Sequence, residues 1–185
     1  MKRTSILLAL ALSALAAGAA LAGALAVGQP APAFTVVSGD EKTLDSSQLK
    51  GKVVTLFYED RDKVEESRPL KNELNRFLAQ QPPGIRKLVA RVAVVDCSSA
   101  AWPFKGFWRD GLKEASQKEG MTIYGDWDGK MRAAYGFPED GTSFLVVGPD
   151  GKVKFIARDA GRIGPGRFGR IEQIITQAAA QARAR

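Results

Sequence analysis

Few residues of this chain could take part in catalysis, and its cysteine and histidine content excludes several classes of active site and metal site. The 185 residues contain one cysteine, Cys97, and no histidine. The absence of histidine excludes Ser-His-Asp and Cys-His mechanisms, a histidine general base, and zinc or haem held by histidine. A single cysteine excludes an intramolecular disulfide, a Cys-x-x-Cys redox pair and cysteine-rich metal sites. We therefore expect no metal and no cofactor.

Cys97 has two interpretations. As a nucleophile it would act alone, in an atypical single-cysteine thiol oxidoreductase or peroxidase. That chemistry needs a thiolate, and hence a cation or a helix N-terminus nearby. Lys105 and Arg109 are close to Cys97 in sequence. The other interpretation, which we favour, is a partly buried and unreactive thiol.

A dense cluster of charged side chains occupies residues 59–66. One interpretation is a ligand or metal site. The structural interpretation is stronger, because Asp62 can cap the N-terminus of a helix with Glu65 at its third position, as in a capping box. Acidic residues in a first helical turn gain about 0.3–1 kcal/mol from the helix dipole. We therefore predict a structural role for this cluster.

The segment of residues 101–108 is rich in aromatic side chains. Aromatic residues are enriched at binding hot spots. We predict that Trp102, Phe104 and Trp108 form a surface that binds a protein partner in the cell envelope. The alternative is that the rings form a local core on the sheet, which is easiest for Phe107 and Trp108 at the start of a helix.

All these residues depend on two buried strands for their positions. Residues 53–58 and 88–95 are continuous apolar runs of strand length, typical of strands buried on both faces. Between them, residues 70–78 carry apolar side chains at helical spacing, which predicts a right-handed βαβ unit. Open α/β sheets place their sites at the carboxyl ends of such strands. We therefore expect the charged cluster, the cysteine and the aromatic loop at one sheet edge.

The other elements complete an α/β domain with a mixed sheet. A helix that begins near Asp62 should be kinked at Pro69. A helical turn should begin at Asp45 as its N-cap and end at Gly51. Expected in order are a hairpin at 34–44, a helix at 108–119, a strand at 121–124, a helical turn at 130–135, strands at 142–147 and 152–156, and a helix at 168–183.

Residues 1–26 have the pattern of a secretory signal peptide. Lys2 and Arg3 precede an apolar segment at residues 6–22, and Ala24-Leu25-Ala26 fits the small-x-small cleavage pattern. We place the mature start at Val27, so that residues 27–185 form one domain. The alternative is that this segment is an uncleaved membrane anchor, but its Ala- and Gly-rich composition, the cleavage pattern and the turn-like Gly28-Gln29-Pro30 favour cleavage. No later apolar stretch approaches the ~20 residues that span a bilayer. We expect a periplasmic protein with no stable membrane anchor after cleavage.

The net charge points to no particular partner. The formal charge is +7, and no block of basic residues with interleaved aromatics is present. Such an excess favours anionic surroundings only weakly. We therefore expect no nucleic-acid partner.

Several segments, taken together and in order, resemble the exported redoxin branch of the thioredoxin-like superfamily. They are residues 27–34, 49–54, 126–137 and 142–153. More narrowly, residues 95–113 resemble the YtfJ-type periplasmic proteins, a cysteine-poor thioredoxin-like family. The resemblance implies a thioredoxin-like fold: a central mixed β-sheet flanked by helices, with an N-terminal β-hairpin extension.

The chain departs from this family where the redox centre belongs. Counting from the helical proline or from the strand puts Arg61 and Val64, or Asp62 and Glu65, at the two cysteine positions. Gly141 stands at the position of the family's cis-proline. The resemblance therefore implies a vestigial active-site loop without dithiol exchange. We predict a binding or accessory module, with a single-cysteine redox enzyme as the alternative.

Overall fold

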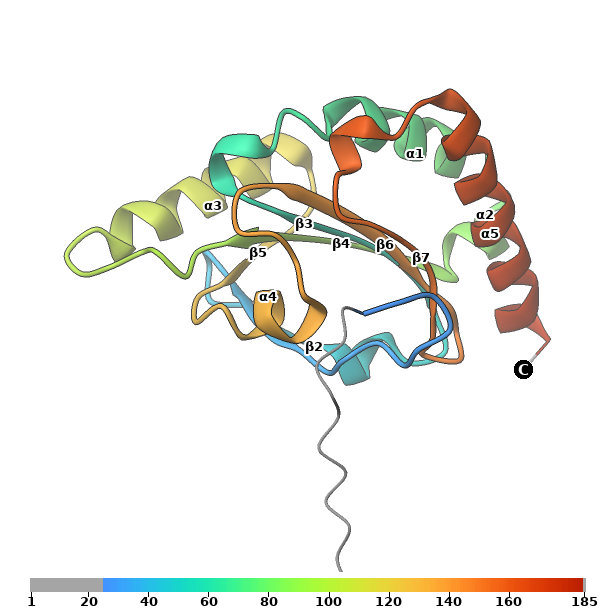
Figure 1. The fold of residues 1–185 in the computed structure, drawn as a ribbon, viewed down its shortest axis with the longest axis horizontal. Helices are drawn as coiled ribbons and strands as arrows, with labels where there is room; N and C mark the ends of the chain where they lie inside the picture. The colour runs from blue at the N-terminus through green and yellow to red at the C-terminus, as the bar shows by residue number, and fades with distance from the viewer. Residues whose placement is uncertain (1–24, 185) are drawn as a thin grey trace, which may run out of the picture.

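The structure is a computed structural model that describes residues 25–184 (Figure 1). Of the predicted signal peptide, residues 1–24 lie outside this description. The strands are β1 (Thr35–Ser38), β2 (Thr43–Asp45), β3 (Val53–Glu59), β4 (Val89–Asp96), β5 (Ile123–Asp126), β6 (Thr142–Val147) and β7 (Val153–Ala157). The α-helices are α1 (Arg68–Gln80), α2 (Pro83–Arg86), α3 (Lys105–Glu119), α4 (Lys130–Tyr135) and α5 (Pro165–Arg183). Short 3₁₀ turns are η1 (Ser46–Leu49), η2 (Arg61–Lys63) and η3 (Ala160–Arg162).

The seven strands form one mixed sheet in the order β2-β1-β5-β4-β3-β6-β7. β4 pairs in parallel with both β3 and β5, and the other pairs are antiparallel. Every residue of β3 is buried, which confirms that this strand is covered on both faces. The predicted parallel pairing of β3 with β4 is also confirmed, in the register Val53↔Val89 to Glu59↔Val95.

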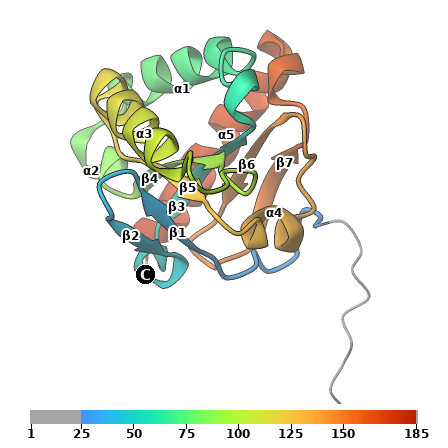
Figure 2. The same ribbon diagram turned by 90° about the vertical axis from the view of Figure 1, so that its left-hand side faces the viewer.

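Helices cover the two faces of the sheet unequally (Figures 1 and 2). On one face, Phe57 of β3 packs with residues of α1 and α5, and its neighbour Ala93 of β4 packs with Leu112 of α3. On the other face, Tyr58 packs with Tyr135 of α4 and with the N-terminal segment. One face therefore carries the three long helices, and α1 and α3 lie on either side of β4.

The helix after β3 begins later than the sequence predicts. α1 starts at Arg68, so Pro69 lies in its first turn, where a proline removes no helical hydrogen bond. The predicted helix start near Asp62 and the kink at Pro69 are therefore wrong. Residues 61–63 instead form the 3₁₀ turn η2.

Other boundaries differ by smaller amounts. α3 begins at Lys105 rather than Trp108, and β5 begins at Ile123 rather than at 121. The predicted N-cap of η1 is confirmed, because the Asp45 side chain accepts from Ser47 N. The Gln48 side chain also accepts from Asp45 N, which completes a capping box. Among residues 25–184, no helix is long and apolar enough to cross a membrane.

The first described residues are built into the domain. Leu25 is 7% exposed and belongs to the core around Tyr58. Arg158 Nη2 donates to the Leu25 carbonyl oxygen at 2.9 Å, and Gly28 N donates to Val153 O at 2.8 Å. The N-terminal segment thereby pairs with the first residue of β7 and the turn before it, where the edge strand would otherwise present unpaired backbone groups.

Candidate functional site

The vestigial loop and Gly141 meet at the carboxyl edge of β3. Asp60 directly follows β3, and its backbone N donates to the carbonyl oxygen of Gly141 at 2.9 Å. The Asp60 side chain accepts from Asp62 N at 2.8 Å. Asp60, rather than the predicted Asp62, therefore caps the turn that follows the strand. The two segments lie side by side, as the sequence resemblance implies.

The four candidate residues of the loop make structural contacts. The Arg61 guanidinium lies 4.6 Å from the ring centroid of Trp108, and Val64 packs against the core under α3. Asp62 pairs with Arg61 at the surface. Glu65 pairs with Arg68 at 2.8 Å, and this bond lowers the pKa of Glu65. No acid lies in the first turn of α1, so the predicted capping box at Asp62 and Glu65 is wrong.

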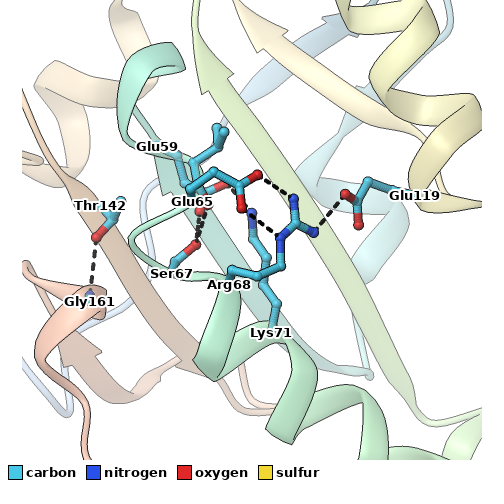
Figure 3. A network of polar contacts seen from close by, with 9 residues as sticks. Glu59, Glu65, Ser67, Arg68, Lys71, Glu119, Thr142 and Gly161 are labelled. Atoms are coloured by element: carbon cyan, nitrogen blue, oxygen red, sulfur yellow. Dashed lines mark hydrogen bonds and ion pairs between the residues drawn. The ribbon is translucent and has the colours of Figure 1, made fainter.

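A buried ion pair closes the end of β3. Glu59 is 2% exposed. Its Oε1 accepts from the hydroxyl of Ser67, and its Oε2 lies 2.6 Å from Lys71 Nζ on α1 (Figure 3). Burial raises the pKa of Glu59, and the hydrogen bonds from Lys71 and Ser67 act in the opposite direction. The sequence analysis missed this pair, because a buried Glu cannot be told from a solvated one within a charged cluster.

Arg68 joins the two helices that flank β4. Its Nη2 lies 2.8 Å from Glu65, and its Nη1 lies 2.7 Å from Glu119 at the end of α3. Figure 3 shows the guanidinium between the two carboxylates, reaching from the start of α1 to α3. These bonds raise the pKa of Arg68. Arg68 is therefore a fixed bridge between α1 and α3.

Cys97 lies under the same edge, directly after β4. The Cys97 side chain is fully buried and belongs to the core under α3. Burial, reinforced by Asp96 and Asp126, raises the pKa of the thiol to about 12. Lys105 and Arg109 extend over the Trp127 ring, at 5.6 and 5.9 Å from its centroid. The geometry favours a protonated and inaccessible thiol.

A second buried polar cluster was also missed from the sequence. Asp96 and Asp126 end neighbouring strands in register and are 7% and 2% exposed. Tyr58 Oη donates to Asp126 Oδ2 at 3.0 Å, and Arg132 Nε lies 3.3 Å from Asp96 Oδ2. Arg132 N also donates to Asp126 Oδ2, at 2.9 Å. The cluster therefore ties α4 to the sheet.

No metal site is found in the part of the chain that the structure describes. Within residues 25–184, no group of three or more Cys, Asp or Glu side chains could hold a metal ion. The carboxylates of Asp96 and Asp126 instead accept hydrogen bonds from Ser98, Tyr58 and Arg132.

The aromatic loop divides into exposed and packed rings. Trp102, Phe104 and Phe107 are 89%, 66% and 71% exposed. Trp108 is partly buried and packs against the core under α3, below the Arg61 guanidinium. The local-core interpretation therefore holds for Trp108 and is wrong for Phe107. We call Trp102, Phe104 and Phe107 the aromatic patch.

No family model matches the chain, and no curated protein matches it. Solved structures do resemble it. A Chlorobium tepidum structure, described as a thiol:disulfide interchange protein DsbE, superposes with a TM-score of 0.63 at 22% identity, covering 84% of this chain and 99% of its own. A thiol peroxidase from Chromobacterium violaceum superposes with a TM-score of 0.61 at 15% identity, covering 86% of this chain and 90% of its own.

A third similar structure is a secreted Mycobacterium tuberculosis disulfide oxidoreductase, described as homologous to E. coli DsbE. It gives a TM-score of 0.55 at 15% identity and covers 78% of this chain and 95% of its own. At these identities the likeness shows the fold alone. The chain has a thioredoxin-like α/β fold, and its single cysteine is Cys97.

Proposed function

We propose that this protein is an exported, YtfJ-type thioredoxin-like module that binds a protein partner of the bacterial envelope and performs no thiol redox chemistry. The observation that carries the proposal is the exposure of three large rings, at 66–89% of their surfaces, in the segment that follows the carboxyl end of β4, the edge where such folds place their sites. Exposed apolar side chains that gather on one part of a surface are typical of interaction sites.

The contacts around the aromatic patch support this role. Trp108 and Leu112 anchor α3 to the sheet, which fixes Phe107 in the first turn of α3 and Phe104 at its N-cap. Trp, and aromatic residues generally, lose little conformational entropy on binding and dominate hot spots. The patch therefore offers pre-positioned apolar area next to basic side chains such as Lys105.

The alternative function, redox chemistry by Cys97, has less support. A nucleophilic thiol must be accessible and ionised at neutral pH. Cys97 is buried, and its pKa is raised to about 12. The side chains at the two vestigial cysteine positions, in either frame, carry no sulfur.

We expect the double substitution Trp102→Ala with Phe104→Ala to remove partner binding and leave the fold unchanged. Truncating hot-spot rings costs about 2 kcal/mol or more of binding free energy, whereas the exposed rings add little to folding. In cells, a photo-crosslinking residue at position 107 should capture an envelope protein in the parent and not in the double variant. The same residue at Lys50, exposed at the end of η1, is the matched control.

A melting temperature lowered by many degrees in the double variant would show that the rings belong to the core. Equal crosslinking at positions 107 and 50 would show that the patch has no specific partner. Either result would remove the basis of the proposed function.

Export is part of the proposal, and the burial of Leu25 supports a cleavage position two residues earlier than the predicted one. Cleavage after Ala26 would remove Leu25, which is buried in the core and hydrogen-bonded to Arg158. Ala22-Gly23-Ala24 also fits the small-x-small pattern. Cleavage after Ala24 would keep Leu25 in the domain, and we propose this position in place of the predicted start at Val27.

Intact mass of the protein recovered from the periplasm should therefore correspond to a chain that starts at Leu25. The substitution Ala24→Leu should block this cleavage, because a large side chain does not fit the last position of the motif. A mature chain that starts at Val27 would contradict the refined position, and a chain that keeps Met1 would contradict export.

A further inference from the structure

A cavity of about 320 Å³ lies between α1, α3 and the sheet. This volume is at the lower end of the range for small-molecule sites. Its walls are mostly apolar, with Phe57 and Ala93 on the sheet, Leu74 on α1 and Leu112 on α3. Of the aromatic patch, Phe107 lines the cavity, and Trp102 and Phe104 do not.

Small residues on α3 keep this space open. These are Gly111 and Ala115, which follow Phe107 at the i, i+4 spacing that aligns side chains on one helix face. All three residues line the cavity. A Cβ added at Gly111 would meet no atom within 4 Å. Gly111 is exposed and Ala115 is half-buried, so the cavity opens to the surface along this face of α3.

Arg91 marks the same opening from the sheet side. It alternates with Ala93 and Val95 on the face of β4 that carries the helices, yet it is exposed. Its Nη1 donates to Asn75 Oδ1 of α1 at 2.8 Å. A charged side chain on this face shows that α1 and α3 leave this part of the strand uncovered.

The charges around the cavity favour an anion. Five basic side chains line it, against the three carboxylates of Glu59, Glu65 and Glu119. Lys71 and Arg68 already hold those carboxylates. Among the described residues, Arg91 and Lys118 have no ion-pair partner within 4 Å. Both are exposed, so their charges lie at the rim.

We propose that this cavity binds a small amphipathic anion, an alkyl chain with an anionic head group. The alkyl chain of the ligand occupies the apolar space between α1 and α3. Its head group lies at the rim, where Arg91 and Lys118 neutralise the negative charge. The Arg68–Glu119 ion pair joins α1 to α3, and so fixes the distance between the two helices that enclose the alkyl chain of the ligand. This site goes beyond the proposed partner binding and does not depend on it.

The test is calorimetric titration of the purified domain with sodium decanoate and, separately, with decan-1-ol. Decanoate should bind with one-to-one stoichiometry. Decanol should bind about tenfold more weakly, because it lacks the charge that the basic rim pairs with. No binding of decanoate at low millimolar concentration, or equal affinity for the two probes, would overturn the proposal.

Two variants locate the binding. Gly111→Leu places a side chain in the cavity and should abolish decanoate binding, whereas Gly169→Leu, a helical glycine of α5 whose added Cβ also meets open space, should bind as the parent does. Ala93→Leu fills the cavity from the sheet and gives a second, independent test. Binding that survives both Gly111→Leu and Ala93→Leu would place the ligand elsewhere and overturn the proposal.

Two double variants test the head-group contact. Arg91→Gln with Lys118→Gln should weaken decanoate binding about tenfold and leave decanol binding unchanged. Arg170→Gln with Lys113→Gln removes equivalent charges from exposed positions outside the cavity and should change neither. An equal loss in both double variants would contradict the assignment of Arg91 and Lys118.

Discussion

Replacing Lys71 by alanine should lower the free energy of unfolding by about 3–5 kcal/mol at neutral pH, because it leaves the carboxylate of Glu59 buried without its counter-charge. Glu59 is 2% exposed and contacts Lys71 at 2.6 Å. The double variant Glu59→Gln with Lys71→Met should recover much of this loss, since it removes both charges and keeps similar volumes. Urea denaturation of the purified variants measures these changes.

The loss in Lys71→Ala should depend on pH. Burial already raises the pKa of Glu59 above 4.5 in the folded protein, and removing Lys71 should raise it further. A group with a raised folded pKa favours the fold below its unfolded pKa, and that contribution is lost as the pH rises through the folded pKa. The variant should therefore recover stability as the pH falls toward 4.5.

A matched control is Lys63→Ala, which removes a surface ion pair with Glu66. Exposed pairs of this kind contribute little to stability, so this variant should unfold like the parent at every pH. A loss for Lys71→Ala that is small, or equal at acidic and neutral pH, would contradict the role given to the Glu59–Lys71 pair.

Cys97 should react with Ellman's reagent at least roughly 1000-fold more slowly than free cysteine at neutral pH, since a thiol with a pKa about 12 holds very little thiolate. Burial should slow the reaction further, because the reagent must reach the sulfur. Unfolding in guanidinium should restore the normal rate, which gives an internal control. Rapid modification of the folded protein would contradict the description of Cys97 as an unreactive thiol.

The two central strands of the sheet were predictable because each is a continuous run of apolar residues. Val53–Glu59 and Val89–Asp96 pair in parallel where the two runs were found. The turn at Asp45 was predictable because its capping box is local in sequence. In each case neighbouring residues alone determine the element.

The site was less predictable, because its contacts join residues far apart in sequence. The start of α1 depends on a turn that Asp60 caps rather than Asp62. The burial of Glu59 depends on Lys71 and Ser67 on the far side of that turn. Phe107 is exposed although it lies in the first turn of α3, whereas its neighbour Trp108 packs against the core. The sequence alone does not show which of these side chains are buried or which residues they contact.

The central claim is that the aromatic patch, and not Cys97, carries the function. One measurement separates the two: site-specific crosslinking from position 107 in living cells, compared among the parent, Cys97→Ser, and Trp102→Ala with Phe104→Ala. We predict that Cys97→Ser captures the same envelope protein as the parent and that the double aromatic variant loses it. Loss of capture in Cys97→Ser, with capture retained in the aromatic variant, would contradict the claim.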